Sequence, residues 1–461
     1  MITRVRRRRH DREILRRHDR EILRRHDREI LRLGVPAFLA LVAEPVFLLT
    51  DSAIVGHLGT PQLAALGVAS AVLGTLVSLC IFLAYGTTAS VARQVGAGRA
   101  SAALAEGVSG LWLASTIGLV VTAVSWPLAR QLTGLFDTSD RVSALAVTYL
   151  HLALLGAVPM LLMLAATGVL RGLQDTRTPL VVAVAGNVAN IGLNLLLVYG
   201  LGPFPGMGIA GSALGTLLAQ LGSAVALVWV VVRAARRARS PLRPHPLGVA
   251  RAARAGVPLV VRTLLLRGSL LVMTYAAARQ GDDELAAMQL ALTIWTFLAF
   301  VLDAVAIAAQ AITGRYLGAA DAEGTRAVTR RIEWWGWATG VATGLLLAAA
   351  SPFLGGVFTG DEHVRGLLVP VLLVAAVAQP VAGIVFVLDG VLIGAGDAVY
   401  LAWAQLASLA LFAPAAYLLH AGGAQPPLVW LWIAFAGLFM GARAVTLVTR
   451  AHGERWMRLG A

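Results

Sequence analysis

The chain has 461 residues, of which 58% are hydrophobic and 13% are charged, and its mean hydropathy is +0.77. Soluble proteins carry about 25% charged residues, so this composition excludes a soluble protein and indicates one that crosses a membrane several times. All 38 basic residues are Arg, and a phosphate-binding loop of the GxxxxGK[ST] type needs Lys, which argues against an ATP-driven pump. The net charge of +14 is attributed to membrane topology rather than to nucleic-acid binding, and the single Cys80 cannot form a disulfide framework or a cysteine metal site.

Residues 1–32 contain the octad RHDREILR three times in succession. Eight residues turn a helix about 80° beyond two full turns, so the Ile-Leu pairs of the three copies do not form one straight apolar stripe. We therefore expect residues 1–32 to be an Arg-rich cytoplasmic tail in water, with contact to anionic lipid head groups as the alternative.

Twelve hydrophobic segments follow the tail, each long enough to cross a hydrocarbon core about 30 Å thick. The sequence therefore predicts an all-α integral membrane protein with twelve transmembrane helices. The segments are residues 33–56, 62–90, 104–128, 144–170, 178–201, 207–233, 256–278, 285–312, 332–358, 364–392, 397–420 and 427–449.

The loops on the side of the N-terminus are rich in Arg, whereas the opposite loops hold only Arg130, Arg141, Arg279 and Arg365. Because cytoplasmic loops carry the excess of basic residues, both termini are expected in the cytoplasm. The use of Arg without Lys and the abundance of Ala suggest a GC-rich bacterial genome, and hence a multi-pass protein of a bacterial plasma membrane.

The two halves of the chain repeat each other at a constant displacement of 222 positions, which carries Arg93 onto Arg315 and Gly96 onto Gly318. Six spans per repeat is an even number, so the two repeats have the same orientation and are related by a pseudo-two-fold axis along the membrane normal. The expected parts are an N-terminal six-helix lobe at 33–233, a cytoplasmic linker at 234–255, a C-terminal six-helix lobe at 256–450 and a cytoplasmic tail at 451–461.

The first span carries two carboxylates, Glu44 and Asp51, which lie seven residues apart and therefore on one helix face. A charge in hydrocarbon costs at least about 2.5–3.5 kcal/mol, so that face should meet protein or a water-filled cavity. A carboxyl group in such a cavity can gain and lose a proton near neutral pH, and a cationic substrate would compete with the proton, which gives antiport. The alternative is that Asp51, about 27 Å along the helix from Leu33, merely lies near the outer end of its helix.

The fifth span carries Asn187, Asn190 and Asn194 on one face, and we expect these amides to face Asp51, with helix-to-helix hydrogen bonds that involve no ion as the alternative. Tyr149, at the start of the fourth span, is a candidate for the same network or for an interfacial aromatic belt.

The second lobe carries charged side chains within its spans, and opposite charges buried in one lobe most often pair. Their alternatives are a second protonation site or a counter-ion for the substrate. The residues are Asp303, Asp389, Arg262 and Arg267. Position 273, which the repeat relates to Asp51, is Met273, so the lobes are expected to share a fold but not the acid.

No residue cluster with the spacing of metal ligands and no nucleophile with its base is apparent, so we expect neither a metal cofactor nor an enzyme. Trp334, Trp335 and Trp337 lie near a span boundary, where an interfacial belt is the ordinary explanation.

Several segments occur in order and at spacings that resemble the multidrug and toxic compound extrusion (MATE) transporters, and within them the DinF-like branch. The segments are DREILRLGVPAFLALVAEPVFLLTDSAIVGHLGTPQLAALGVA, LRGLQDTRTPL, GNVANIGLNLLLVYGLG, GIAGSALGT, FVLDAVAIAAQAITGRYLGA and FVLDGVLIGAGD. The resemblance covers about residues 25–450. It implies two six-helix lobes that form a V, and drug or metabolite efflux driven by H⁺ or Na⁺.

By this resemblance Asp51 matches the acid that takes up the coupling ion, Pro36 a proline where the first helix bends, and Tyr149 a cavity tyrosine. Asn190 matches the Asn of a family pattern that has Asp four residues later, where this chain has Asn194. Without that second carboxylate a Na⁺ site lacks one hard, charged ligand, whereas a proton needs only Asp51, so we expect H⁺ rather than Na⁺.

We therefore expect a monomeric, cation-coupled efflux antiporter that exports amphipathic organic cations by alternating access, with no nucleic-acid partner. The alternative is a lipid-linked precursor flippase or a metabolite exporter of the same superfamily. Flippases tend to have additional helices and cationic cavities, whereas the candidate cavity residues of the first lobe are acidic and amide: Glu44, Asp51 and Asn187.

Overall fold

The computed structural model describes residues 2–201, 204–421 and 428–460, and almost all of them are helical. Two strands of two residues pair antiparallel at one end of the molecule. The elements are α1 (Ile2–Gly56), α2 (Thr60–Cys80), α3 (Phe82–Gly96), α4 (Ala100–Ser125), α5 (Ala129–Gly134), α6 (Asp140–Leu155), α7 (Ala157–Gly172), α8 (Arg177–Tyr199), β1 (Gly200–Leu201), β2 (Phe204–Pro205), α9 (Ile209–Arg237), α10 (Pro246–Ala278), α11 (Asp282–Gly318), α12 (Ala322–Phe358), α13 (Glu362–Gly394), α14 (Ala398–Ala421), α15 (Leu428–Ala434), the π-helix η1 (Phe435–Met440) and α16 (Gly441–His452).

In the described part of the chain, eleven helices are long and apolar enough to cross a membrane, and there are twelve spans when the bent pair α6–α7 counts as one. This confirms the prediction of twelve transmembrane helices. The fourth span is not straight, because α6 and α7 meet at an angle of 47°. Pro159, in the first turn of α7, has no N–H to bond back across the break at Gly156.

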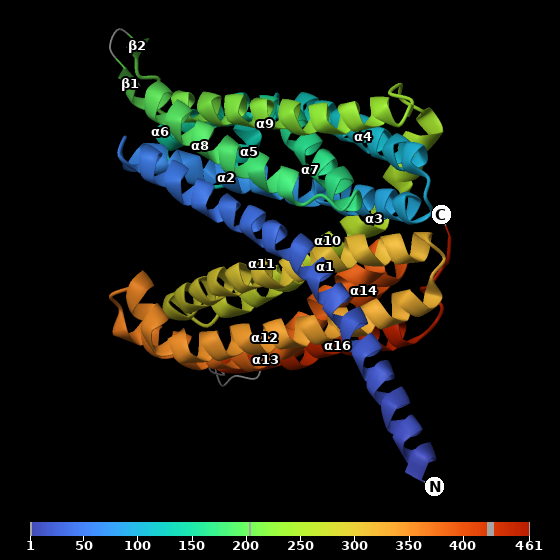
Figure 1. Ribbon diagram of the computed structural model, residues 1–461. Coiled ribbons are helices and arrows are strands. Elements are labelled where there is room, and N and C mark those ends of the chain that lie inside the picture. The colour runs from blue at the N-terminus through green and yellow to red at the C-terminus, as the bar shows by residue number, and fades with distance from the viewer. Residues whose placement is uncertain (1, 202–203, 422–427, 461) are drawn as a thin grey trace.

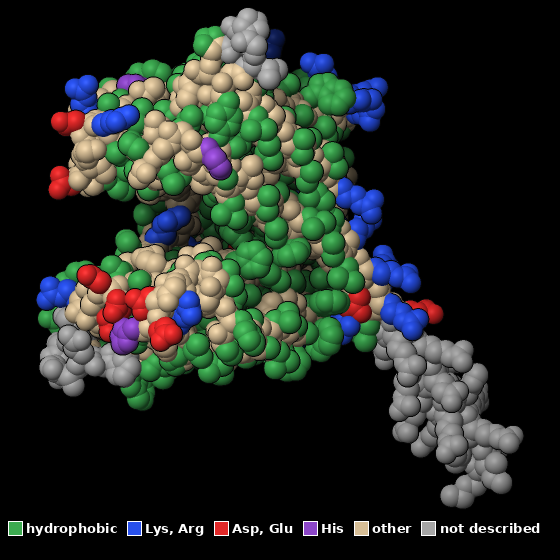
Figure 2. Space-filling view, turned by 90° about the vertical axis from the view of Figure 1, so that its left-hand side faces the viewer, with side chains coloured by type: hydrophobic (Ala, Val, Ile, Leu, Met, Phe, Trp, Pro, Cys, Tyr) green, Lys and Arg blue, Asp and Glu red, His purple; other side chains and the backbone are tan. Residues whose placement is uncertain are grey.

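Helices α2 to α9 form the N-lobe and α10 to α16 form the C-lobe, and the two lobes diverge toward one end of the molecule and meet at the other (Figure 1). Figure 2 looks at the open end and shows a hollow between the lobes, with basic side chains inside it. Both ends of the chain lie at the closed end. Two six-helix lobes are the architecture that the internal repeat predicts, and the V is the arrangement that the family resemblance implies.

The internal repeat is visible at the closed end, where α3 of the N-lobe packs on α11 of the C-lobe. A Cβ atom at Gly96 would lie 1.9 Å from the carbonyl oxygen of Arg315, and a Cβ atom at Gly318 would lie 1.9 Å from the carbonyl oxygen of Arg93. The displacement of 222 relates these two contacts to each other, so the pseudo-two-fold axis passes between α3 and α11. Only glycine allows the two backbones to approach so closely.

Helix α1 belongs to both lobes. Its half toward the open end packs on α8, and its half toward the closed end packs on α11 and α12. The third octad therefore does not lie in water as expected, because its His26 and Ile30 are buried. Ile30, and Leu33 directly after the octad, belong to the hydrophobic core of the C-lobe. One copy of the octad is enough to place these positions on a single helix face, although three copies cannot form a continuous stripe.

The loop between the lobes is also shorter than the predicted linker of residues 234–255. Helix α9 continues to Arg237 and α10 begins at Pro246. The ring nitrogen Nδ1 of His245 accepts a hydrogen bond from the backbone N–H of Gly248 at 3.2 Å, and Pro246 at the first helical position lacks an N–H that would need a partner. These two residues start α10 ten residues before the predicted C-terminal lobe.

Candidate functional site

Asp51 is the centre of a buried polar cluster in the N-lobe. The residue is 4% exposed, and its Oδ1 accepts hydrogen bonds from Nδ2 of Asn194 at 2.8 Å and from Oγ of Ser212 at 2.7 Å. Nδ2 of Asn194 also donates to Oδ1 of Asn190 at 3.2 Å, and Nδ2 of Asn190 donates to Oγ1 of Thr216 at 3.1 Å. Helices α1, α8 and α9 thus bring one carboxylate, two amides and two hydroxyls together.

Helix α8 is held parallel to α1 by hydrogen bonds above and below this cluster. Nδ2 of Asn187 donates to the carbonyl oxygen of Ala43 at 2.8 Å, and the hydroxyl of Tyr199 donates to the carbonyl oxygen of Ile54 at 2.7 Å. Asn187 therefore does not join the cluster at Asp51, although it lies on the same face of α8. Its hydrogen bond sets the register in which Asn194 reaches Asp51.

Tyr149 is 4% exposed and lies beside Ser212 and Thr216, so it belongs to the buried cluster rather than to an interfacial belt. The cluster is tightly packed, because a Cβ atom at Gly215 would lie 2.1 Å from Oδ1 of Asn194. This Oδ1 atom is buried and accepts no hydrogen bond from the residues that the structure describes. It is an acceptor held close to Asp51.

Ser212 and Thr216 were not predicted from the sequence. They stand four residues apart in the segment GSALGT, and so on one face of α9. This spacing could have indicated a polar face on α9. Hydroxyl side chains in helices often bond to their own backbone, however, so spacing alone does not distinguish them from packing residues.

Glu44 lies on α1 two turns from Asp51 and is exposed, yet protein atoms surround much of its side chain. Such a position is typical of a residue that lines a hollow. Helix α1 is continuous through Pro36 and through a second proline, Pro45, which lies next to Glu44. Each proline removes a backbone hydrogen bond, so α1 has two weak points between the third octad and Asp51.

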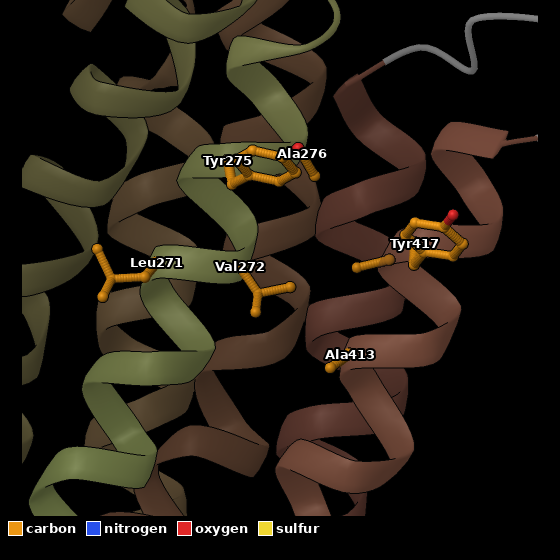
Figure 3. A pocket seen from close by; sticks show the side chains of 7 residues that line it. Leu271, Val272, Tyr275, Ala276, Ala413 and Tyr417 are labelled. Carbon is orange, nitrogen blue, oxygen red and sulfur yellow. The ribbon is translucent and has the colours of Figure 1, made fainter.

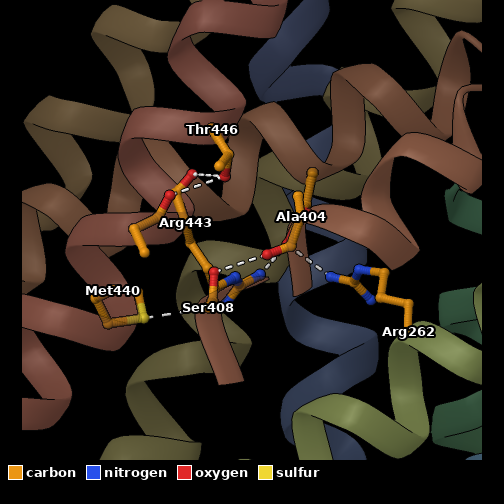
Figure 4. A network of polar contacts seen from close by, with 8 residues as sticks. Arg262, Ala404, Ser408, Met440, Arg443 and Thr446 are labelled. Atoms are coloured by element: carbon orange, nitrogen blue, oxygen red, sulfur yellow. Dashed lines mark hydrogen bonds and ion pairs between the residues drawn. The ribbon is translucent and has the colours of Figure 1, made fainter. Parts of the chain in front are cut away.

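In the C-lobe, Asp389 on α13 lies between Arg262 and Arg443, two arginines that Figure 4 labels. Its Oδ2 accepts a hydrogen bond from Nη2 of Arg262 at 2.6 Å and another from Nη2 of Arg443. All three side chains are at least about nine-tenths buried. The pair with Arg262 was expected from the sequence, but Arg443 was not. Arg443 follows the π-helix η1, a rare element that often occurs at functional positions.

Asp303 on α11 lies within electrostatic range of charged groups of both lobes, including Arg171 of the N-lobe. No described residue forms an ion pair with Asp303. Arg267 is exposed and has no ion-pair partner among the described residues, so the expectation that it pairs within the lobe is wrong. It stands five residues after Arg262 and therefore on a different face of α10.

A separate pocket of about 350 Å³ lies between α10 and α14 (Figure 3). Leu271, Tyr275 and Tyr417 line it and are each more than 60% exposed. Its lining is apolar apart from the two phenol groups, so it offers no carboxylate or amide for ion coupling.

The fold and the site together define a class of protein. Two like-oriented six-helix lobes, a hollow open at one end and a carboxylate buried in one lobe are typical of membrane transporters that work by alternating access.

The MatE family model matches the chain at residues 36–196 and again at 258–418, once in each lobe and at the same displacement of 222. The chain belongs to the MATE family of multidrug and toxic compound efflux transporters. These proteins are secondary transporters and not enzymes.

Curated relatives come from plants and bacteria. The chain is 31% identical over 392 residues to Protein DETOXIFICATION 44, chloroplastic, of Arabidopsis thaliana. The aligned region covers 81% of this chain and 73% of the relative. It is 28% identical over 378 residues to DNA damage-inducible protein F of Escherichia coli K12, with 79% of each chain covered. A solved MOP superfamily transporter from Pyrococcus furiosus has the same fold, with a TM-score of 0.82, 21% identity and coverage of 92% of this chain and 96% of that one.

Proposed function

We propose that this protein is an H⁺-coupled antiporter that exports amphipathic organic cations across a bacterial plasma membrane, with both termini in the cytoplasm. The observation that carries the proposal is Asp51, a buried carboxylate of the N-lobe that is held by uncharged amide and hydroxyl donors. The Arg-rich loops at the closed end support the orientation, because the basic loops of membrane proteins face the cytoplasm.

In the proposed cycle the open end faces outward. An external proton binds Asp51 and displaces the cationic substrate, for which Asp51 and the exposed Glu44 supply negative charge in and beside the hollow. The protonated lobe then turns inward, releases the proton to the cytoplasm and binds the next substrate. A single negative charge that holds either a proton or a cation couples the two movements without a further energy source.

The donors around Asp51 favour H⁺ over Na⁺ as the coupling ion. Nδ2 of Asn194 and Oγ of Ser212 both direct hydrogen atoms at Oδ1 of Asp51, which is the arrangement that an ionised carboxylate needs. A Na⁺ ion in the same place would meet the positive end of the Asn194 amide, and Asn194 would have to turn its Oδ1 atom inward to act as a ligand.

One observation favours the alternative of an exporter for metabolites or lipid-linked precursors. Basic side chains lie inside the hollow, and a substrate with a carboxylate or phosphate group would find partners there. This substrate class differs from the organic cations in the sign of its charge, so a direct uptake assay separates the two.

The test is transport by the purified protein in proteoliposomes. A pH gradient without Na⁺ is expected to drive uptake of ethidium, a Na⁺ gradient without a pH gradient is expected not to, and Asp51→Asn is expected to abolish the flux. Asp282→Asn, at the exposed start of α11, is the matched control and should keep full activity. Na⁺-driven flux, or full H⁺-driven flux in Asp51→Asn, contradicts the proposal.

A further inference from the structure

Arg93 of the N-lobe is bound at the closed end by backbone carbonyl groups of the C-lobe. Its Nη1 donates to the carbonyl oxygen of Ala395 at 2.9 Å, and its Nη2 donates to that of Gly460 at 3.0 Å and to that of Arg458. The backbone N–H of Gly460 in turn donates to the carbonyl oxygen of Leu317 on α11 at 2.9 Å. The C-terminal residues therefore join the two lobes.

Arg315, which the repeat relates to Arg93, is held by the other end of the chain. Its Nη2 forms an ion pair with Oε1 of Glu29, in the third octad of α1. The two equivalent arginines at the α3–α11 crossing are thus each bound by a terminal segment: Arg93 by the residues before the C-terminus, and Arg315 by the octad.

A second and stronger contact fixes the octad to the C-lobe. Nε and Nη2 of Arg331 on α12 donate to Oδ1 and Oδ2 of Asp27 at 2.6 and 2.8 Å, and Nε1 of Trp335 donates to Oδ1 of Asp27 at 2.8 Å. The guanidinium of Arg331 also stacks on Trp334, 4.3 Å from the ring centre. Two of the three tryptophans that were expected in an interfacial belt therefore take part in binding the octad: Trp335 bonds Asp27 directly, and Trp334 packs on Arg331.

The same helix carries Asp51, 24 residues further along, which is about 36 Å on a continuous helix. The middle of α1 is thus anchored to the C-lobe through Asp27 and Glu29, and its C-terminal end is bound in the N-lobe through Asp51. The lobes cannot separate at the closed end while both anchors hold, unless α1 bends at Pro36 or Pro45.

We propose that Asp27 and Glu29 are positioning residues of the transport cycle: the third octad is a clasp that holds the closed end shut while the hollow is open at the opposite end, and the clasp must release before the lobes exchange access. This inference rests on the proposed alternating access. It assigns a role to the octad, and it explains why two ion pairs and an indole hydrogen bond hold a segment that lies outside the apolar run of α1.

The test measures the distance between spin labels at Arg177→Cys and Val399→Cys, in a Cys80→Ala background. The repeat relates these two exposed positions at the closed end, one in each lobe. The double change Asp27→Asn with Glu29→Gln is expected to raise the ratio of long to short distances by roughly tenfold. Glu454→Gln removes an exposed ion pair within the C-lobe, with Arg326 at 2.6 Å, and should leave the distances unchanged.

Charge reversal separates a clasp from a merely structural contact. Glu29→Arg is expected to shift the distances as the double change does, and Glu29→Arg combined with Arg315→Glu is expected to restore them. Unchanged distances in folded Asp27→Asn, Glu29→Gln protein, or failure of the exchanged pair to restore them, overturn the inference.

The repeat supplies a further test, because removal of residues 9–24 leaves one complete octad directly before Leu33. That deletion is expected to keep both the distances and the flux, whereas removal of residues 9–32 is expected to release the clasp. The distance measurement needs neither substrate nor coupling ion. If the clasp variants shift the distances but the unmutated protein shows no H⁺-driven flux, the proposed function alone is contradicted. If the unmutated protein shows normal flux but the clasp variants leave the distances unchanged, the clasp alone is contradicted.

Discussion

At the scale of single residues, the polar cluster around Asp51 in the N-lobe has an unequal distribution of hydrogen bonds. Asp51 receives two hydrogen bonds on one oxygen, while Oδ1 of Asn194 is buried without a hydrogen-bond partner in the described chain. Asn194 supplies one of these two hydrogen bonds and also the oxygen without a partner, and it stands where the resemblance to the family leads us to expect an acid. The residue thereby decides how many negative charges the cluster holds.

We predict that Asn194→Asp changes the ion dependence of transport. Two carboxylates less than about 3 Å apart cannot both be ionised easily, so the pair retains a proton and H⁺-driven flux at neutral pH falls about tenfold. A second carboxylate also supplies the hard ligand that Na⁺ lacks, so added Na⁺ should restore part of the flux. Flux measurements with and without Na⁺ check this, and the prediction fails if Na⁺ has no effect on the variant.

Gly215→Ala tests the packing of the same cluster. The added methyl group would lie 2.1 Å from Oδ1 of Asn194, so Asn194 must turn away from Asp51 or α9 must move, at about 1–3 kcal/mol. We expect a lower melting temperature and a loss of H⁺-driven flux. Gly222→Ala lies on the same helix with no atom within 4 Å of its added Cβ, and it should change neither quantity.

At the scale of elements, α1 and the α3–α11 crossing determine how the lobes can move. Helix α1 carries the acid of one lobe and the anchor to the other, with two prolines between them. Helices α3 and α11 touch through equivalent glycines on the pseudo-two-fold axis. Contact is close because glycine has no side chain to separate the two backbones.

Because this crossing is symmetric, Gly96→Ala and Gly318→Ala should have the same effect. Each added methyl group would lie 1.9 Å from a carbonyl oxygen of the other lobe, so each should destabilise the closed end by about 1–3 kcal/mol. Label distances across the closed end should lengthen equally in the two variants. Gly86→Ala on α3, with no atom within 4 Å of its added Cβ, is the control, and an effect of only one variant would contradict the symmetry.

At the scale of the whole molecule, the lobes share a fold but not their chemistry. The N-lobe holds the buried acid on α1, whereas the C-lobe has Met273 at the equivalent position and places its charges at Asp389, Arg262 and Arg443. Asp389 in the C-lobe is already paired with two cations. Asp51 is the acid that the proposed cycle uses, and Asp303, which forms no ion pair with a described residue, is a second unpaired carboxylate in the C-lobe.

Coupling through Asp51 alone, without Asp303, predicts electroneutral exchange of one proton for one monovalent cation. Uptake of a monovalent dye by proteoliposomes should respond to an imposed pH gradient and should not respond to a potassium diffusion potential applied at equal pH on both sides. Ethidium suits the measurement because its charge is fixed. Uptake driven by the membrane potential alone would require a second charge to move and would contradict the prediction.

The sequence by itself determined the twelve spans, the repeat and the acid with its asparagines, because polar residues stand out in apolar segments and helical spacing assigns each of them to a face. It did not reveal Ser212, Arg443 or the docking of the third octad, and it paired Arg267 wrongly. A helix period fixes which residues share a face, but not which neighbour that face meets. Only the packing of helices from distant parts of the chain decided that Ser212 bonds Asp51, that Arg443 rather than Arg267 shares Asp389, and that Asp27 binds Arg331.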